Sequence, residues 1–443
     1  MRYFPHTEAD IREMLAAVGA ASVDELFDSV PADCRFSGSP ALPEALDEWR
    51  LSRRLEGMAA EAGGDWRVFL NAGSQSHHIP ALVPQLAGRS EFLTAYTPYQ
   101  PEMSQGTLQA IFEYQTLVAR LTGMDVANAS MYDGSTAMAE AVLMAQRAKK
   151  RRAVAVSGLV HPHWREVLRT YLAPADDVEI LTLPAGPDGR TDLSALDGLA
   201  EPAVLVMQSP NFLGVVEDLS AAAEKIHKAG GLLAAGFSEP FALGLLRAPG
   251  QCGADIAFGE GQGLGLSQSF GGPGLGLLAA KNEFMRQIPG RLVGETVDNQ
   301  GRRGFVLTLS TREQHIRRGK AVSNICSNAG HCALTAAVFM ASIGGTGFRK
   351  MAQVNRDLAE YLKAGLVAAG FKPLSDAPTF NEFALLAPAR FAAKHAELRR
   401  RKILAGMPLA PYYPEYADAW LFGVTEANGR EDIDELLHFI GKA

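Results

Sequence analysis

Short hydrophobic runs recur through the middle of the chain, and helical segments separate several of them. The candidate strands are residues 153–156, 178–183, 203–208, 232–237, 256–258 and 276–280. Residues 164–172 and 221–229 are typical of the intervening helices. Such an alternation predicts an α/β fold with a mostly parallel sheet covered on both faces. Ligands of these sheets bind beyond the carboxyl ends of the strands.

The segments before and after this alternation predict two smaller regions. Residues 1–65 read as an N-terminal helical arm, with helices expected at 7–19, 22–30 and 43–62. Residues 66–310 make up the large α/β domain. Residues 311–443 predict a smaller C-terminal α+β domain, with a long amphipathic helix at 346–369, strands at 380–386 and 419–424, and a terminal helix at 431–440.

Composition and charge narrow the possible functions. The chain has 443 residues, 47% of them hydrophobic, which is enough for a large core. Its net charge of −7 gives no support to nucleic-acid binding. We find no apolar run of membrane-spanning length and no signal peptide, and the four cysteines are scattered, so we expect a cytoplasmic protein with reduced thiols. The paired loop histidines at 77 and 78 lack a metal-ligand spacing, and we expect them to be solvated.

A polar segment near residue 100 is the first candidate for chemistry. Pro98 and Pro101 favour an extended loop there. A helix follows, with hydrophobic residues at helical spacing and a stop at Gly123. The candidate side chains of this segment are Tyr96, Thr97, Tyr99, Gln100, Glu102 and Ser104.

A second candidate is the start of the next helix. Gly134, Ser135 and Thr136 follow Asp133 and open an alanine-rich helical segment. Backbone N–H groups at such a start can bind an anion. An ordinary capped helix start accounts for the same residues, and the sequence leaves both interpretations open.

Two long runs make the chain resemble a known family. YTPYQPEMSQGTLQAIFEYQ, followed by TGMDVANASMYDGSTAMAEA, resembles the glycine cleavage system P-protein, and more narrowly its N-terminal, alpha-type subunit. The later run TREQHIRRGKAVSNICSN is also similar to this family, and the resemblance covers essentially the whole chain. It implies a fold-type-I architecture of enzymes that depend on pyridoxal phosphate (PLP).

That architecture sets requirements which the chain meets only in part. A PLP enzyme needs a lysine to hold the cofactor, an acid facing the pyridine nitrogen, a phosphate cup and usually a side chain stacked on the ring. The lysine is expected shortly after residue 258, yet no lysine lies between Lys228 and Lys281, and the amide of Gln262 forms no imine. The candidate remnant pocket is Gly134, Ser135 and Thr136 for the phosphate, His161 for the ring, Glu239 for the nitrogen and Gln262 at the lysine position.

The resemblance implies a division of labour that explains the missing lysine. In the two-subunit P-protein the beta-type chain carries PLP, and the alpha-type chain completes the shared active site. The expected function is thus the alpha subunit of glycine dehydrogenase (aminomethyl-transferring, decarboxylating), in an assembly of two alpha-type and two beta-type chains. Glycine loses CO2, and its aminomethyl group passes to the lipoyl group of H-protein. The polar residues from Tyr96 to Ser104 would line the shared site.

Three alternatives remain open from the sequence. The polar segment merely forms the subunit interface, or the whole chain is a non-catalytic scaffold that stabilises a partner enzyme. A stand-alone PLP enzyme, such as an aminotransferase or desulfurase, is a third possibility, against which the absent lysine argues.

Overall fold

The computed structural model describes residues 5–36, 38–63, 65–93, 97–175 and 177–441. The chain divides into two compact units, residues 1–64 and residues 65–443. The further division of the second unit at residue 310 stays a prediction.

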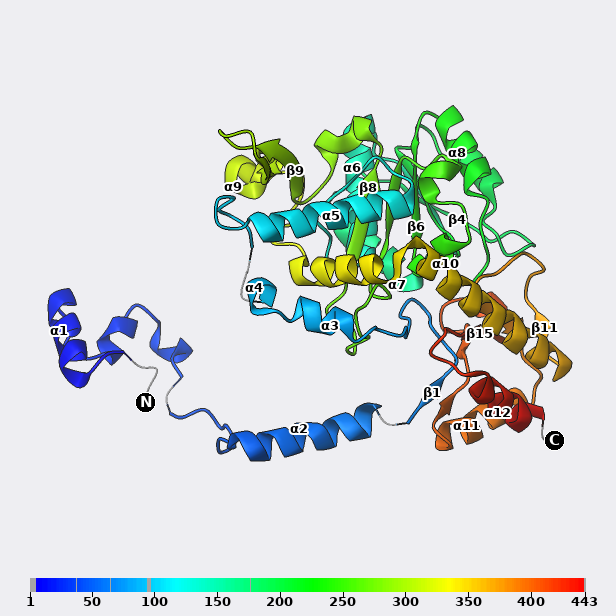
Figure 1. The fold of residues 1–443 in the computed structure, drawn as a ribbon, viewed down its shortest axis with the longest axis horizontal. Coiled ribbons are helices and arrows are strands. Elements are labelled where there is room, and N and C mark those ends of the chain that lie inside the picture. Colours follow the sequence, from blue (N-terminus) through cyan, green and yellow to red (C-terminus); the bar gives the residue numbers. More distant parts are fainter. Residues whose placement is uncertain (1–4, 37, 64, 94–96, 176, 442–443) are drawn as a thin grey trace. The chain divides into compact units, whose positions relative to one another are not determined.

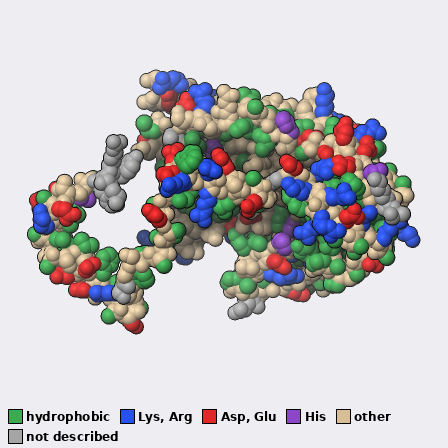
Figure 2. All heavy atoms as spheres, turned by 90° about the horizontal axis from the view of Figure 1, so that it is seen from below, with side chains coloured by type: hydrophobic (Ala, Val, Ile, Leu, Met, Phe, Trp, Pro, Cys, Tyr) green, Lys and Arg blue, Asp and Glu red, His purple; other side chains and the backbone are tan. Residues whose placement is uncertain are grey.

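The N-terminal unit is helical and exposes hydrophobic side chains. Helix α1 (Glu8–Val18) begins at a capping box formed by Thr7 and Asp10. The helix expected at 22–30 is instead a short 3-10 turn at 24–27, since the chain approaches Pro31. The helix expected from residue 43 starts later, as α2 (Glu48–Gly63), because the Asp47 carboxylate accepts the N–H of Arg50 at 2.8 Å and caps it there. Figure 2 shows hydrophobic side chains on the surface of this segment.

A seven-stranded sheet forms the centre of the second unit (Figure 1). Its strand order is β2-β8-β7-β6-β5-β3-β4, and the five strands from β7 to β4 are parallel. The strands are β2 (Val126–Ala127), β3 (Val154–Ser157), β4 (Ile180–Leu183), β5 (Val204–Gln208), β6 (Leu232–Phe237), β7 (Ile256–Glu260) and β8 (Gly276–Ala280). The last predicted strand, β8, runs antiparallel to β7, and the predicted α/β class with a mostly parallel sheet is confirmed.

Helices cover both faces of this sheet because neighbouring residues of a strand point to opposite sides. Val154 and Val156 of β3 pack with helices α6 (Gly134–Lys149) and α7 (Pro162–Leu172). Ala155, between them, faces the other core, which contains α5 (Gln105–Thr122), α8 (Leu219–Lys228) and part of α10 (Gly330–Ala368). The carboxyl ends of the parallel strands are therefore held at a common edge of a covered sheet.

A smaller antiparallel sheet follows in the C-terminal part, in the order β11-β12-β15-β14. Its strands are β11 (Lys372–Pro373), β12 (Glu382–Leu386), β15 (Ala419–Gly423) and β14 (Met407–Pro408). Helices α11 (Phe391–Arg400) and α12 (Arg430–Gly441) and the end of α10 pack against it. Shorter pieces are α3 (Leu82–Ala87), α4 (Ser90–Leu93), α9 (Gln314–Arg317), the hairpin β9 (Leu292–Val297) and β10 (Arg303–Thr308), and the parallel pair β1 (Arg67–Val68) and β13 (Ile403–Leu404).

Helix α10 corrects one expectation from the sequence. We expected no apolar run of membrane-spanning length, but α10 is long and apolar enough to cross a membrane by length and composition alone. Gly344, with a φ of 59°, interrupts its helical geometry. Phe339 and Phe348, on either side, are buried in the core of this unit. The core helix of a folded domain passes the same test, so α10 carries no argument for a membrane.

Candidate functional site

The expected acid and lysine positions lie at the ends of two neighbouring parallel strands. Glu239 follows β6 and Gln262 follows β7, and both are buried. A loop at residues 71–78 passes over this edge and contacts both. The Gln262 amide oxygen accepts the N–H of Gln75 at 3.0 Å, and its nitrogen donates to the carbonyl of Leu266 at 2.7 Å. Gln262, at the position expected for the lysine, therefore holds the loop at 71–78 by a hydrogen bond.

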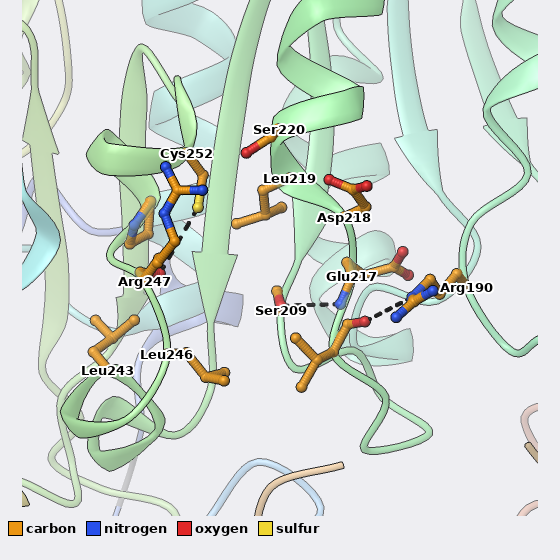
Figure 3. Close-up of a pocket in the computed structure, with 12 residues that line it drawn as sticks. Arg190, Ser209, Glu217, Asp218, Leu219, Ser220, Leu243, Leu246, Arg247 and Cys252 are labelled. Atoms are coloured by element: carbon orange, nitrogen blue, oxygen red, sulfur yellow. Dashed lines mark hydrogen bonds between the residues drawn. The ribbon is translucent and has the colours of Figure 1, made fainter. Parts of the chain in front are cut away.

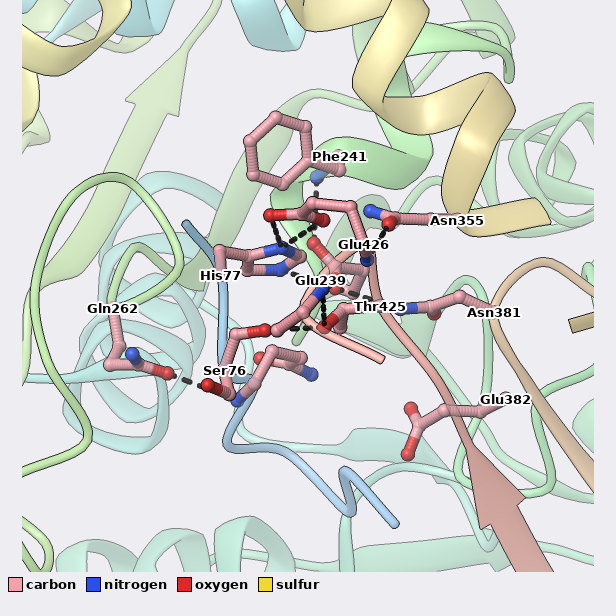
Figure 4. Close-up of polar contacts among 12 residues, drawn as sticks. Ser76, His77, Glu239, Phe241, Gln262, Asn355, Asn381, Glu382, Thr425 and Glu426 are labelled. Carbon is pink, nitrogen blue, oxygen red and sulfur yellow. Dashed lines mark hydrogen bonds and ion pairs between the residues drawn. The ribbon is translucent and has the colours of Figure 1, made fainter. Parts of the chain in front are cut away.

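His77 is the centre of this cluster (Figure 4). Its Nε2 lies 3.1 Å from the Glu239 carboxylate and its Nδ1 lies 3.0 Å from the Glu426 carboxylate. Its side chain is 2% exposed and packs on the ring of Phe241, with centroids 4.6 Å apart. Burial alone would lower the pKa of His77, but the two carboxylates outweigh burial and raise the pKa to about 10. His77 is thus a buried imidazolium between two acids.

This arrangement corrects the expectation that both loop histidines are solvated. His78 is exposed, but the side chain of His77 is buried, because Glu239 and Glu426 supply the counter-charges that a buried cation needs. His77 also lies against the backbone beside the lysine position, since a Cβ on Gly263 would lie 3.0 Å from its Cδ2. The imidazole therefore stands between the acid expected for a pyridine nitrogen and the position expected for the lysine.

Further polar groups complete the acid cluster. The Glu239 carboxylate also accepts from the Asn381 side chain at 3.0 Å and from the N–H of Phe241 at 2.9 Å. Glu382 accepts the N–H of Ala72 at 2.6 Å. Burial raises the pKa of Glu382 to about 7, and the charge of Glu239 adds to this effect. These contacts satisfy the acids from within the chain.

The expected phosphate cup is filled by carboxylates. The N–H of Gly134 donates to Glu260 at 2.9 Å, and the N–H of Thr136 and the hydroxyl of Ser135 donate to Asp133 at 2.8 and 2.6 Å. Asp133 and Thr136 form a reciprocal capping box at the start of α6. The N–H groups of Gly134 and Thr136 and the Ser135 hydroxyl thus already bind acidic side chains, as the capped-helix interpretation describes.

His161, the expected ring-stacking residue, is packed inside the protein. It caps α7, its ring lies nearly parallel to that of Trp164 at 5.7 Å, and its Nε2 lies 3.1 Å from the Ala72 carbonyl. Burial lowers its pKa to about 4, so the imidazole is neutral. Gly73, with a φ of +91°, lies so close that a Cβ there would be 2.8 Å from the ring. The loop at 71–78 thus covers His161 as well as Gln262 and Glu239.

The polar segment near residue 100 lies partly outside the described residues, since Tyr96 falls there. Thr97 accepts a hydrogen bond from the Arg291 guanidinium, and the same group lies 5.0 Å from the Tyr99 ring centroid. Gln105 bonds both the N–H and the carbonyl of Phe305 in β10. Ser104 precedes α5 without capping it through its side chain. Of the described candidate side chains, Tyr99, Gln100 and Glu102 belong to exposed residues. The segment therefore sits against the β9–β10 hairpin.

A separate pocket at the start of α8 is a weaker candidate (Figure 3). Its volume is about 280 Å³, and Arg190 and Leu219 belong to its lining. Some of its polar groups already have partners: the Ser209 hydroxyl accepts the N–H of Glu217 at 3.2 Å. None of the side chains predicted from the sequence as site residues lines it. We therefore retain the edge of β6 and β7, and the segment beside Arg291, as the candidate sites.

The family of the chain follows from its similarity to known proteins. The family model described as glycine cleavage system P-protein matches residues 1–440. The chain belongs to this family. Members that it resembles include the probable glycine dehydrogenase (decarboxylating) subunit 1 of Desulfotalea psychrophila, 53% identical over 100% of this chain and 99% of that protein. The protein of the same name from Anaeromyxobacter dehalogenans is 50% identical over 97% and 98% of the two chains.

Solved structures agree with the P-protein assignment. A crystal structure of the P-protein glycine decarboxylase of the glycine cleavage system, in inhibitor-bound form, matches with a TM-score of 0.90 and 48% identity over 100% of both chains. A sphingosine-1-phosphate lyase of Burkholderia pseudomallei shares the fold alone, with a TM-score of 0.67 and 16% identity. The chain thus has the fold-type-I architecture of PLP-dependent enzymes.

The residues of this P-protein chain do not fit a covalently bound PLP. Gln262 offers no amine, His77 occupies the space beside Glu239, and Asp133 and Glu260 take the donors of the phosphate cup. A dianionic phosphate at the start of α6 would meet these carboxylates instead of free N–H groups. The missing lysine was the feature of the sequence that predicted this misfit with PLP. The roles of His77 and Glu426 could not be predicted from the sequence, because the two residues meet only in the tertiary structure.

Proposed function

We propose that this chain is the alpha-type subunit of glycine dehydrogenase (decarboxylating) and acts with a PLP-bearing beta-type subunit. The two form an assembly of two alpha-type and two beta-type chains in the cytoplasm. In that assembly glycine is decarboxylated, and its aminomethyl group passes to the lipoyl group of H-protein. This chain contributes residues to the shared site and holds no cofactor of its own.

One observation carries this proposal: in a chain with the P-protein fold, the residues expected to hold a cofactor are bonded to other groups of the same chain. Two features support the proposal: Glu239 is already paired with His77, and residue 262 is a glutamine, which offers no amine for the cofactor. Catalysis with PLP therefore needs a second chain. Relatives about 50% identical over nearly their whole length carry the name of subunit 1, which implies a partner subunit.

Helix α2 supports a protein partner. Leu51, Leu55 and Met58 recur at helical spacing and are exposed, as is Trp49 in the first turn of the helix. A row of exposed hydrophobic side chains along one helix face marks an interaction surface, since covering it removes apolar area from water. We infer that the N-terminal unit contacts the beta-type chain through this face.

The polar segment supplies the side chains for the shared site in this proposal. Thr97 and Tyr99 are held by Arg291, while Gln100 and Glu102 are exposed and free to meet the partner. Tyr96 and Ser104 complete the set that we propose lines the site. Their roles are to orient glycine and to exclude water, because the electron sink for decarboxylation belongs to the partner's cofactor.

The test is reconstitution with a separately purified, lysine-bearing partner chain. We expect a PLP absorbance band in the partner only, and no exchange of bicarbonate into the glycine carboxyl group by this chain alone. Mixing both chains with lipoylated H-protein should restore exchange. A PLP band in this chain after purification, or exchange without the partner, contradicts the proposal.

The scaffold alternative predicts a different result for the polar segment. If the chain only stabilises its partner, Thr97→Ala and Tyr99→Phe leave the exchange rate of the assembled complex unchanged. If these residues line the shared site, the rate falls although the complex still assembles. Sedimentation of the mixed chains separates a loss of rate from a loss of assembly.

A further inference from the structure

A cavity beside the polar segment contains a buried positive charge. Arg291 immediately precedes β9 and is 4% exposed. It lines a cavity of about 700 Å³ together with Tyr99, Leu307, Ser310, Glu313 and Ile325. The Arg291 guanidinium therefore lines this cavity together with apolar side chains such as Leu307 and Ile325.

The hydrogen bonds of Arg291 leave its charge uncompensated. One terminal nitrogen donates to the Thr97 hydroxyl, and the Tyr99 ring lies 5.0 Å from the guanidinium carbon. Its Nε is buried and has no hydrogen-bond partner within the described ranges. None of the ion pairs between described residues involves Arg291. A buried cation without a counter-ion is costly, so the arrangement calls for an anion.

Arg312 shows what a purely structural arginine looks like in the same region. It is also buried, but its guanidinium donates to three backbone carbonyls, those of Ile288, Leu309 and Gly290. Burial lowers its pKa. Arg312 thus fastens the loops around it, whereas Arg291 retains a donor with no acceptor. Because Arg312 has protein acceptors and Arg291 has an unpaired donor, we expect a ligand at Arg291 and none at Arg312.

We propose that this cavity binds the carboxylate of a small amino acid through Arg291. The Nε of Arg291 is enclosed by the protein, so the donor that can reach a carboxylate in the cavity is the terminal nitrogen that is not bonded to Thr97. Glu313, whose side chain is 13% exposed, lines the same cavity and provides a negative charge for the ammonium group. His315 also lines the cavity, and its Nδ1 lies 3.9 Å from the Glu313 carboxylate. A cavity lined by both the Arg291 guanidinium and the Glu313 carboxylate complements a zwitterion better than a dianionic phosphate. This inference rests on the proposed function, in which glycine is the substrate.

The test is saturation-transfer NMR on the purified full chain with glycine and, separately, with acetate. Acetate carries only the carboxylate, so it isolates the Arg291 contact. We expect both ligands to bind, and Arg291→Gln to weaken both at least about tenfold, the effect of one lost charge-assisted contact. Glu313→Gln should weaken glycine and leave acetate unchanged.

Arg303→Gln is the matched control. Arg303 lies on the same hairpin and also faces an aromatic ring, that of Phe305 at 4.9 Å, but it is exposed and paired with Glu295. This variant should bind both ligands like the wild type. If Arg291→Gln fails to fold, the Nε–H resonance of Arg291 in ¹⁵N-arginine-labelled wild type replaces it, and acetate should shift that resonance. Absence of the shift, or equal binding by Arg291→Gln, overturns the inference.

Failure of this inference is distinguishable from failure of the proposed function. If the assembled complex catalyses exchange but this chain binds neither acetate nor glycine, the carboxylate site is wrong and the subunit assignment stands. If this chain binds both but no partner restores exchange, the subunit assignment is wrong and the site stands.

Discussion

Replacement of His77 by alanine tests whether the chain depends on the ion cluster formed by His77, Glu239 and Glu426. His77 connects the carboxylates of Glu239 and Glu426, both of which are largely buried. Without the imidazolium the two acids face each other across a small cavity with no cation between them. We expect His77→Ala to lower the free energy of unfolding by about 3–5 kcal/mol, the usual cost of removing one partner of a buried ion pair.

The pH dependence of stability gives a second figure for the contribution of His77 to the free energy of unfolding. The pKa of His77 is raised from 6.5 in the unfolded chain to about 10 in the folded protein. The folded state therefore holds this proton more tightly, which stabilises it fully below pH 6.5, and the stabilisation is lost as the pH rises through 10. A shift of this size corresponds to about 5 kcal/mol, comparable with the mutational figure.

Urea unfolding at several pH values between 6 and 10 is the assay. The wild type should lose stability over this range, and His77→Ala should lack that loss. The double variant His77→Gln with Glu239→Gln should recover part of the stability, because it removes a buried charge along with its partner. Equal unfolding midpoints for the wild type and His77→Ala at pH 7 would refute the reasoning.

Three further predictions concern Glu382, Gln262 and the exposed face of helix α2. Burial raises the pKa of Glu382 to about 7, so the wild type should lose up to about 3 kcal/mol relative to Glu382→Gln between pH 4.5 and 7, as measured by urea unfolding. Gln262→Lys should not create a PLP absorbance band, because the pocket stays filled; a reducible Schiff base in that variant would contradict the filled-pocket interpretation. Leu55→Ser should weaken binding to the partner chain about tenfold in titration calorimetry and leave the thermal stability of the isolated chain unchanged, since Leu55 is exposed.

Local pattern was enough to predict the central sheet, because strands buried on both faces are continuous hydrophobic runs whatever surrounds them. The strands at 204–208 and 232–237 fall within one residue of the predicted runs. Element boundaries in the N-terminal unit were less predictable. The start of α2 depends on which residue caps it, and Asp47 lies four residues beyond the proline at which we expected the helix to begin.

The sequence by itself determined the fold class, the family and the absence of an amine at residue 262, because these depend on residue identity and local order. Only the tertiary structure decided what fills the pocket. His77 meets Glu239 and Glu426 across 162 and 349 residues of chain, and Arg291 meets Thr97 across 194. A charge becomes buried, paired or unpaired only when folding removes water and brings such distant groups together, so no local pattern records it.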